Sequence, residues 1–224
     1  MHDKKGMMKI PGGYFITLEG IEGCGKSTQA AMLVSYLKGR GFGVTHTREP
    51  GGTAIGRRIR AILLDPESSG ITGTTELLLY SADRAQHMAE IIEPALAGGD
   101  VVVCDRFTDA TLAYQGFGRG LDKGPIAELN GLATHGRKPR LTLLLDLPVE
   151  DGLGRAIGRN DKDGIYHEAR FELEAYTFHE KVRQGYLDIA AAEPGRVKVV
   201  DAAGTVDAVH AAIRATADEA LKVL

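Results

Sequence analysis

Hydrophobic residues along this chain fall into short apolar runs that alternate with longer segments of helical spacing. Four runs are short, rich in β-branched or aromatic residues, and end at a charged residue, which is typical of buried strands. They cover residues 14–18, 101–104, 141–145 and 197–200. The more polar segment 43–47 is a fifth candidate strand, because Pro-Gly-Gly follows it shortly afterwards.

The segments between these runs repeat apolar residues every three or four positions. In residues 27–38, Ala30, Leu33, Val34 and Leu37 share one helical face, which predicts a helix packed on a core. By the same pattern, helices are expected over residues 55–64, 75–97 and 206–224.

This alternation predicts an α/β fold in which a doubly wound, parallel, five-stranded sheet is flanked by helices. We expect one domain over residues 14–224 and a flexible leader over residues 1–13. In such sheets ligands bind outside the carboxyl ends of the strands. Functional side chains are therefore expected where the predicted strands end, at Glu19, Arg48, Asp105, Asp146 and Asp201.

Composition narrows the classes of function. Glycine accounts for 29 of 224 residues, against an average near 7%, which indicates places of close backbone approach. The net charge of -3 argues against nucleic acid as a partner. No apolar run approaches the roughly 20 residues of a membrane span, and two cysteines without a signal-like segment favour a cytoplasmic protein.

A phosphate-binding motif follows the first predicted strand. Residues 20–27, GIEGCGKS, match G-x-x-x-x-G-K-[ST] between a strand and a helix. In such a loop glycines turn backbone N–H groups toward phosphate oxygens, lysine adds a charge, and the serine hydroxyl reaches Mg²⁺. The motif predicts ATP and Mg²⁺ as ligands of Gly20, Ile21, Glu22, Gly23, Cys24, Gly25, Lys26, Ser27 and Thr28.

The same motif occurs in switch GTPases, which the rest of the sequence does not favour. Residues 201–204 match D-x-x-G, but they follow the last strand and no N-K-x-D comes after them. Residues 160–163, NDKD, have the wrong order for guanine recognition.

Five motifs together resemble the bacterial thymidylate kinases. FITLEGIEGCGKST (15–28), TREPGGT (47–53), LYSADR (79–84), DRF (105–107) and AYQGFGRG (113–120) occur in the order and at about the spacings of that family. The resemblance covers residues 14–224 and implies a P-loop NTPase fold with a mobile lid, here residues 155–170. It further implies a homodimer that phosphorylates dTMP to dTDP with ATP and Mg²⁺.

The resemblance also implies roles for residues at the strand ends. Arg106 would hold the acceptor phosphate, with Arg48 as a second contact and Pro50 as a wall of the base pocket. Asp105 and Ser27 would act on Mg²⁺. From the residues alone, an ion pair between Arg106 and Asp105 stays open as another interpretation.

For the nucleoside, the resemblance implies that Tyr80 stacks on thymine and that Arg84 bonds its carbonyl. Glu22 would meet the 3′-hydroxyl, and Thr111 and Gln115 would face the base and sugar. Without the resemblance, an aromatic residue on a helix is more often part of the core, so both interpretations of Tyr80 stay open.

The lid arginine is predicted from what the motif lacks. Members of the family without an arginine in the phosphate loop carry a catalytic arginine on the lid, and residues 21–24 contain none. Arg159 is our first candidate, with Arg155, Lys162 and Arg170 as alternatives, and a solvated charged surface is the other interpretation of each.

Two further points affect the predicted site. Gly116, Gly118 and Gly120 are expected to form a loop that touches the nucleotide. Ala110 and Ala169 stand where the family usually has a small hydroxyl residue and an acid, respectively.

Other acceptors and other functions stay open. A kinase for another nucleotide or nucleoside is one alternative, and a P-loop switch or binding module is a second. A nucleoside kinase would need a carboxylate base, whereas a monophosphate acceptor is already largely ionised near neutral pH.

Overall fold

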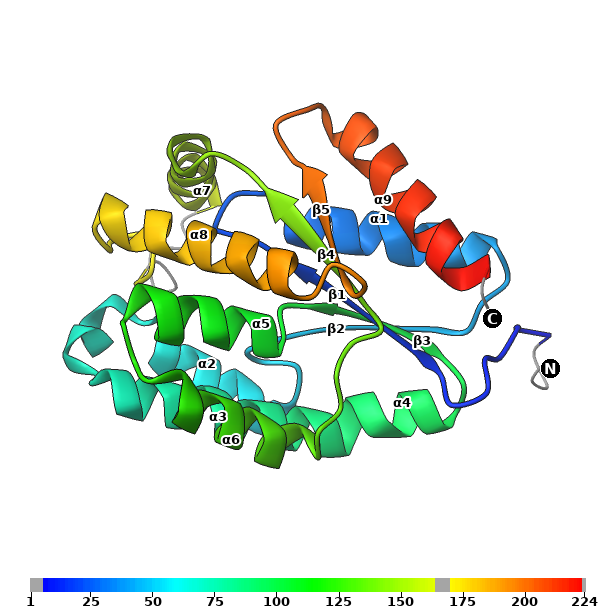
Figure 1. Cartoon of the computed structure of the whole chain (residues 1–224), viewed down its shortest axis with the longest axis horizontal. Helices are drawn as coiled ribbons and strands as arrows, with labels where there is room; N and C mark the ends of the chain where they lie inside the picture. Colours follow the sequence, from blue (N-terminus) through cyan, green and yellow to red (C-terminus); the bar gives the residue numbers. More distant parts are fainter. Residues whose placement is uncertain (1–5, 164–169, 223–224) are drawn as a thin grey trace.

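The computed structural model describes residues 6–163 and 170–222 and contains one parallel sheet with the strand order β2-β3-β1-β4-β5 (Figure 1). The strands are β1 (Tyr14–Glu19), β2 (Val44–Arg48), β3 (Val101–Asp105), β4 (Leu141–Asp146) and β5 (Val197–Asp201). The predicted sheet is confirmed, and each strand lies within one residue of its expected bounds.

Helices connect the strands and cover the sheet. The α-helices are α1 (Lys26–Gly39), α2 (Ala54–Leu64), α3 (Gly73–His87), α4 (Glu93–Ala97), α5 (Thr108–Thr111), α6 (Lys123–Thr134), α7 (Val149–Asp163), α8 (Tyr176–Ala192) and α9 (Val206–Lys222). Shorter helical segments are η1 (Pro66–Gly70), η2 (Met88–Ile92) and η3 (Leu112–Gly118). In the part of the chain that the structure describes, no helix is long and apolar enough to cross a membrane.

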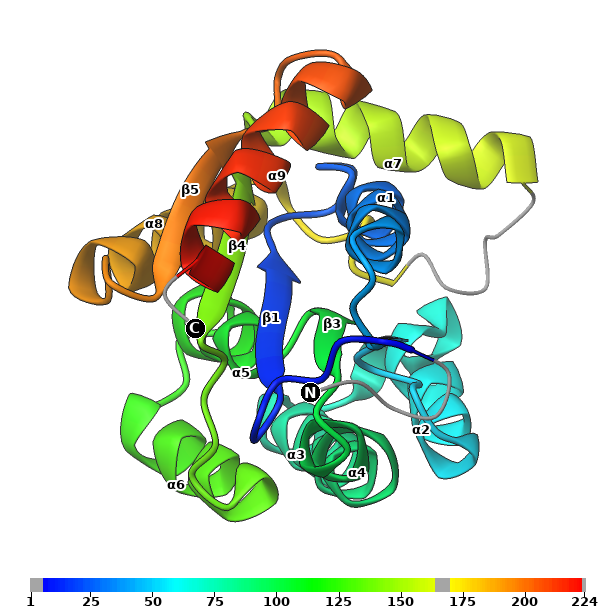
Figure 2. The same cartoon turned by 90° about the vertical axis from the view of Figure 1, so that its right-hand side faces the viewer.

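Successive residues of β1 face opposite sides of the sheet, which divides the core into two layers. Ile16 and Leu18 belong to a cluster with the apolar residues of α1 and α9. Phe15 belongs to a second, smaller hydrophobic cluster. There its ring contacts Phe107 edge to face, with 4.9 Å between the ring centroids. Figure 2 shows α1 and α9 side by side and α7 lying beyond the carboxyl end of β1.

The helix expected over residues 75–97 begins earlier and is interrupted. Thr72 caps it, because its hydroxyl accepts the N–H of Thr75 at 3.3 Å, so α3 starts at Gly73. The π-helical turn η2 then separates α3 from α4 just before Pro94. Proline has no N–H to donate to a regular helical turn, and this accounts for the interruption.

The prediction that Gly116 and Gly118 form a loop is wrong, because both residues lie in the helical segment η3. A Cβ atom on Gly118 would stand 2.6 Å from the ring of Phe178, and one on Gly185 would stand 2.6 Å from the ring of Phe117. These glycines allow η3 and α8 to pack closely. Gly120, with a φ of 74°, lies beyond the end of η3.

Parts of the predicted leader and lid lie outside the described residues. From Gly6 onward the leader contacts the domain: Met8 pairs with Phe42, and the Ile10 N–H donates to Gly99 O at 2.9 Å. Its flexibility stays a prediction. Of the predicted lid, residues 164–169 and the side chains of Arg159 and Lys162 are not described.

Candidate active site

A cavity of about 270 Å³ opens at the carboxyl ends of β1, β2 and β3. Twelve predicted site residues line it: Glu22, Gly23, Lys26, Ser27, Arg48, Pro50, Tyr80, Arg84, Asp105, Arg106, Thr111 and Gln115. Their roles stay predictions, but the fold brings them together as the sheet topology requires. We call the end with residues 20–27 and Asp105 the cradle end, and the end with Tyr80, Arg84, Thr111 and Gln115 the base end.

At the cradle end, the loop after β1 is held by glycines. Gly20, Gly23 and Gly25 have φ values of 138°, 69° and 92°, a region that L side chains rarely adopt. The Lys26 ammonium turns back on this loop, donating to Ile21 O at 2.6 Å and to Cys24 Sγ at 3.5 Å. The loop therefore already supplies hydrogen-bond acceptors for the Lys26 ammonium. Phosphate oxygens would replace these acceptors.

The cradle is also in close contact with the first turn of α7. A Cβ atom on Gly23 would lie 1.9 Å from Gly152 O, and one on Gly152 would lie 2.6 Å from Glu22 O. Only a residue without a side chain fits at either position. Sequence reasoning missed Gly152, because a glycine inside a helix carries no motif of its own.

Ser27 and Asp105 face each other between α1 and β3. The Ser27 hydroxyl donates to Asp105 Oδ2 at 2.6 Å. A hydroxyl and a carboxylate oxygen, beside a loop of backbone N–H groups, are the ligand types that Mg²⁺ takes together with phosphate oxygens. The residues present therefore fit the predicted metal.

Arg106 directly follows β3 and has a φ of 70°. Its Nη2 donates to Glu22 Oε1 at 2.9 Å and to the Tyr114 hydroxyl at 3.0 Å, and its Nη1 donates to the Tyr186 hydroxyl at 3.1 Å. The ion pair of Arg106 is thus with Glu22 and not with Asp105. Tyr114 and Tyr186 were missed, since each contacts Arg106 only through the fold.

Glu22 is held as a carboxylate. Burial alone would raise its pKa, but His179, Arg106 and Lys26 outweigh burial and keep the pKa below its usual range. The Tyr114 hydroxyl also donates to Glu22 Oε1, at 2.5 Å. The other oxygen, Oε2, lies 3.5 Å from His179 Nδ1.

A second buried acid, Glu19, lies beneath Arg106. Its oxygens accept the Phe107 N–H at 2.7 Å and the Tyr186 hydroxyl at 2.9 Å. Burial, and then the nearby Asp109, raise the pKa of Glu19 to about 8. Near neutral pH this side chain therefore holds a proton.

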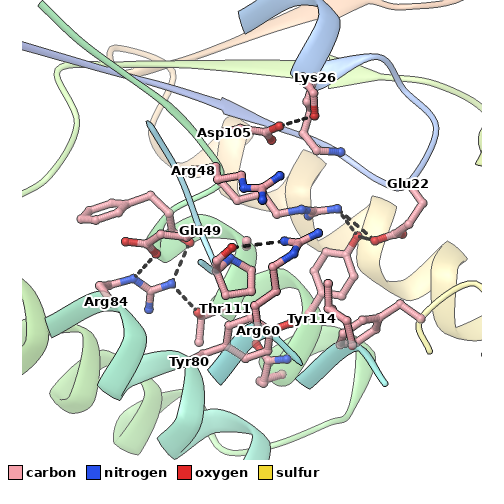
Figure 3. Close-up of a pocket in the computed structure, with 18 of the residues that line it drawn as sticks. Glu22, Lys26, Arg48, Glu49, Arg60, Tyr80, Arg84, Asp105, Thr111 and Tyr114 are labelled. Carbon is pink, nitrogen blue, oxygen red and sulfur yellow. Dashed lines mark hydrogen bonds and ion pairs between the residues drawn. The ribbon is translucent and has the colours of Figure 1, made fainter. Parts of the chain in front are cut away.

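Two arginines lie between the cradle end and the base end. In Figure 3, Arg48 and Arg60 lie below Lys26 and above Tyr80, with Glu22 to their right. Arg60 donates to Pro50 O at 3.1 Å. Sequence reasoning missed Arg60, although α2 was predicted, because nothing in the sequence indicated which face of α2 meets the cavity.

At the base end, Arg84 is 1% exposed and its guanidinium is largely occupied. It donates to Glu49 Oε2 at 2.9 Å, Asn130 Oδ1 at 2.7 Å, Phe107 O at 3.1 Å and Thr111 Oγ1 at 2.9 Å. These four bonds leave at most one of its five N–H groups for a ligand.

Tyr80 fits both of its sequence interpretations. Its side chain lines the cavity and also packs against the main hydrophobic core. Burial raises the pKa of its hydroxyl, so the ring stays neutral over the physiological range. A neutral aromatic ring at this position can offer its face to a base.

The lid candidates differ in their surroundings. Arg155 donates to Ala202 O at 3.4 Å. Arg170 is 5% exposed, and its guanidinium bonds to Leu63 O and, at 2.7 Å, to Glu76 Oε2, beside the base end. The side chain of Arg159 lies outside the described residues.

Glu76 is a further residue that sequence reasoning missed at the base end. It lies four residues before Tyr80 and eight before Arg84 on α3, so a count along the helical face could have found it.

Comparison with known proteins gives one consistent result. The family model described as thymidylate kinase matches residues 18–213. A thymidylate kinase of Geotalea uraniireducens is 57% identical over 203 residues, covering 91% of this chain and 95% of that protein. One of Geobacter sulfurreducens is 55% identical over 201 residues, covering 90% and 94%.

Among solved structures, the thymidylate kinase from Ehrlichia chaffeensis superposes with a TM-score of 0.74 at 34% identity, covering 93% of this chain and 99% of that one. The matched residues 18–213 include every residue that lines the cavity. The chain therefore belongs to the thymidylate kinase family.

Proposed function

We propose that this protein transfers the γ-phosphoryl group of ATP to dTMP, giving dTDP and ADP, with Mg²⁺ as cofactor. The observation that carries the proposal is the cavity itself, which joins a phosphate cradle to a pocket containing Tyr80 through a cluster of arginines. Membership of the thymidylate kinase family supports the choice of substrates.

At the cradle end, backbone N–H groups of residues 20–28 and the Lys26 ammonium would hold the ATP phosphates. Ser27 and Asp105, already joined by a 2.6 Å hydrogen bond, would hold Mg²⁺. The ion supplies positive charge to the phosphate oxygens when it is bound.

Toward the base end, Arg106 and Arg48 would bind the acceptor phosphate, for which the guanidinium fork is well shaped. Glu22 would accept the 3′-hydroxyl of the sugar. The base would lie against Tyr80 and Pro50, with Arg84, Thr111 and Gln115 along its edge. Arg48 is exposed to solvent at the end of β2, which leaves its side chain accessible to the ligand.

Reaction then requires positioning more than proton transfer. An oxygen of the dTMP phosphate forms the new bond to the γ-phosphorus, while the bond from that phosphorus to the β-γ bridging oxygen breaks and ADP leaves with the electron pair. The acceptor is already ionised, so no general base is needed. Lys26, Arg106 and a lid arginine, Arg159 in our proposal, would stabilise the spread charge.

The test is a panel of acceptors with ATP and Mg²⁺, in which coupled release of ADP is measured for dTMP, dUMP, CMP, GMP and thymidine. We expect dTMP to give the highest kcat/KM. Preference for thymidine would indicate a nucleoside kinase, and nucleotide binding without acceptor-dependent ADP release would indicate a switch or binding module.

We further propose that the protein is a homodimer. Four apolar side chains on the neighbouring helices α2, α3 and α6 are about half exposed or more: Ile55 at 50%, Ile62 at 49%, Leu78 at 50% and Leu132 at 74%. An apolar face of this kind typically marks a protein interface.

The dimer is tested by light scattering on Leu78→Glu, which should shift the mass toward that of a monomer. Val206→Glu is the matched control, because Val206 is 53% exposed but lies on α9. An unchanged mass for Leu78→Glu would contradict the proposed face.

We also infer a cytoplasmic location, which the two free, buried cysteines Cys24 and Cys104 support.

A further inference from the structure

The base end contains a buried carboxylate that has no place in the roles proposed above. Glu76 is 1% exposed and lies on α3. Arg119 donates to it through Nε at 3.3 Å and Nη2 at 3.2 Å, and Arg170 donates to Oε2 at 2.7 Å. A carboxylate with two arginines and almost no access to water is fixed in place and in charge.

This carboxylate also receives the side chain of Gln115. The amide nitrogen of Gln115 lies 2.8 Å from Glu76 Oε1. Gln115 is 1% exposed and lines the cavity, so its amide group stands between Glu76 and the space that a ligand would fill.

The charge of Glu76 decides which way this amide points. Burial would raise the pKa of Glu76, but hydrogen bonds from Arg119, Gln115 and Arg170 lower it below its usual value. An ionised carboxylate can only accept hydrogen bonds. Gln115 must therefore turn its NH₂ group toward Glu76, because the reverse orientation would set two oxygens against each other.

The orientation leaves the amide oxygen of Gln115 as the group available to a ligand. An oxygen there accepts a hydrogen bond and repels a lone pair. Thymine and uracil carry an N–H at position 3 of the ring, whereas cytosine has an unprotonated nitrogen at the same position. Gln115 therefore distinguishes the two classes by the direction of one hydrogen bond, in addition to the contact that Arg84 would make with the group at position 4.

We propose that Glu76 is a positioning residue for base selection: by holding the Gln115 amide nitrogen, it presents the amide oxygen to the base and so selects pyrimidines with an N–H at position 3. The inference rests on the proposed kinase function and adds a residue that need not touch the substrate. Arg119 and Arg170 contribute by keeping Glu76 charged and in place.

The test compares dTMP with the monophosphate of 5-methyl-2′-deoxycytidine, which keeps the methyl group but lacks the N–H. Glu76→Gln puts an amide where the carboxylate was, so Gln115 can adopt either orientation. We expect the ratio of kcat/KM for the two acceptors to fall at least about tenfold. Partial unfolding lowers both rates equally and leaves this ratio unchanged.

Glu174→Gln is the matched control. Glu174 binds the same Arg119, at 2.6 Å from its Nη2, but makes no described contact with Gln115. In Glu174→Gln the ratio of kcat/KM for the two acceptors should stay within about twofold of the wild-type ratio, because Glu174 acts independently of Gln115. A fall as large as that of Glu76→Gln would mean that any loosening around Arg119 is enough, and would overturn the proposal.

Gln115→Leu provides a second variant, which also serves if Glu76→Gln does not fold. Removing the amide should lower the ratio at least as far as Glu76→Gln, and adding Glu76→Gln to it should change the ratio no further. An unchanged ratio in Gln115→Leu, or a further fall in the double variant, contradicts the proposal. Failure of the proposed function is a separate result: the wild type would then release no ADP with dTMP.

Discussion

The cradle end of the cavity offers mainly backbone, whereas the base end offers side chains that already bind one another. At the cradle, three glycines with positive φ hold the loop, and Lys26 bonds to the loop itself. At the base end, Arg84 alone joins four partners from three other parts of the chain. The cradle is therefore a local structure, and the base end depends on the assembled fold.

The difference has consequences for how each end tolerates change. Backbone groups cannot be removed by substitution, so the cradle is damaged mainly by adding atoms. The base end is damaged by removing them, because a lost partner leaves a buried charge or amide unpaired. The following four predictions use this contrast; the first three run from the largest expected effect to the smallest, and the fourth is a dependence on pH.

Arg106→Ala removes the guanidinium that stands between the two ends. We expect kcat/KM for dTMP to fall by about 10²–10³-fold, because one charge-stabilising donor is lost in a water-poor site. ATP affinity should change little, and calorimetric titration with ATP measures it alongside ADP release. Arg106→Lys keeps the charge without the fork and should recover only part of the loss. Equal loss of ATP binding would contradict the assigned role.

Gly152→Ala adds a single methyl group against the cradle. Its Cβ would stand 2.6 Å from Glu22 O, so we expect about 1–3 kcal/mol of lost stability and weaker ATP binding. Gly154→Ala is the control on the same helix, since a Cβ there meets nothing within 4 Å and should gain up to about 1 kcal/mol. Urea unfolding measures both variants, and similar effects would refute close packing as the cause.

Tyr80→Ala tests the base end by removing a stacking surface. We expect KM for dTMP to rise roughly tenfold, the usual range for a base on an aromatic ring, while KM for ATP stays the same. Tyr80→Phe retains the ring and should behave like the wild type. If Tyr80→Ala raised both KM values together, Tyr80 would be a core residue only.

Glu19→Gln tests whether the buried Glu19 carboxyl group, beside Arg106, is protonated in the folded protein. The folded-state pKa of Glu19 is raised to about 8 from 4.5, so the folded protein keeps a proton that the unfolded chain releases. This contribution to stability is complete below the unfolded value and is lost as the pH rises to about 8, by at most about 1.4 kcal/mol per pH unit.

Glutamine cannot titrate, so the stability of Glu19→Gln relative to the wild type should rise between pH 5 and 8. Urea unfolding at pH 5, 6, 7 and 8 measures the difference. Parallel curves for the two proteins would show that Glu19 is ionised in the folded state throughout this range.

The same contrast explains what the sequence could predict. The strands and the position of the loop between β1 and α1 were predicted well because each is contiguous: β1 is an apolar run, and residues 20–27 form one motif. Interactions across the fold carry no such signal. Tyr186 bonds to Glu19 from 167 residues away, and Arg170 bonds to Glu76 from 94 residues away.

Two expectations needed correction or extension for related reasons. The glycines of η3 indicated a nucleotide loop, but the close partner of Gly118 is α8, whose position the sequence does not specify. Arg170 was an alternative for the lid arginine because it falls in the predicted lid, yet its guanidinium is buried against Glu76. Residue type indicated the chemistry in each case, and only the fold indicated the partner.

The contacts of Lys26 bear on the design of inhibitors. With its ammonium already bonded to Ile21 O and Cys24 Sγ, any ligand of the cradle exchanges hydrogen bonds and does not simply add them. A neutral acceptor would replace one carbonyl by another and gain little, whereas an anion gains from the charge. Compounds that leave the cradle empty and occupy the base end avoid this exchange altogether.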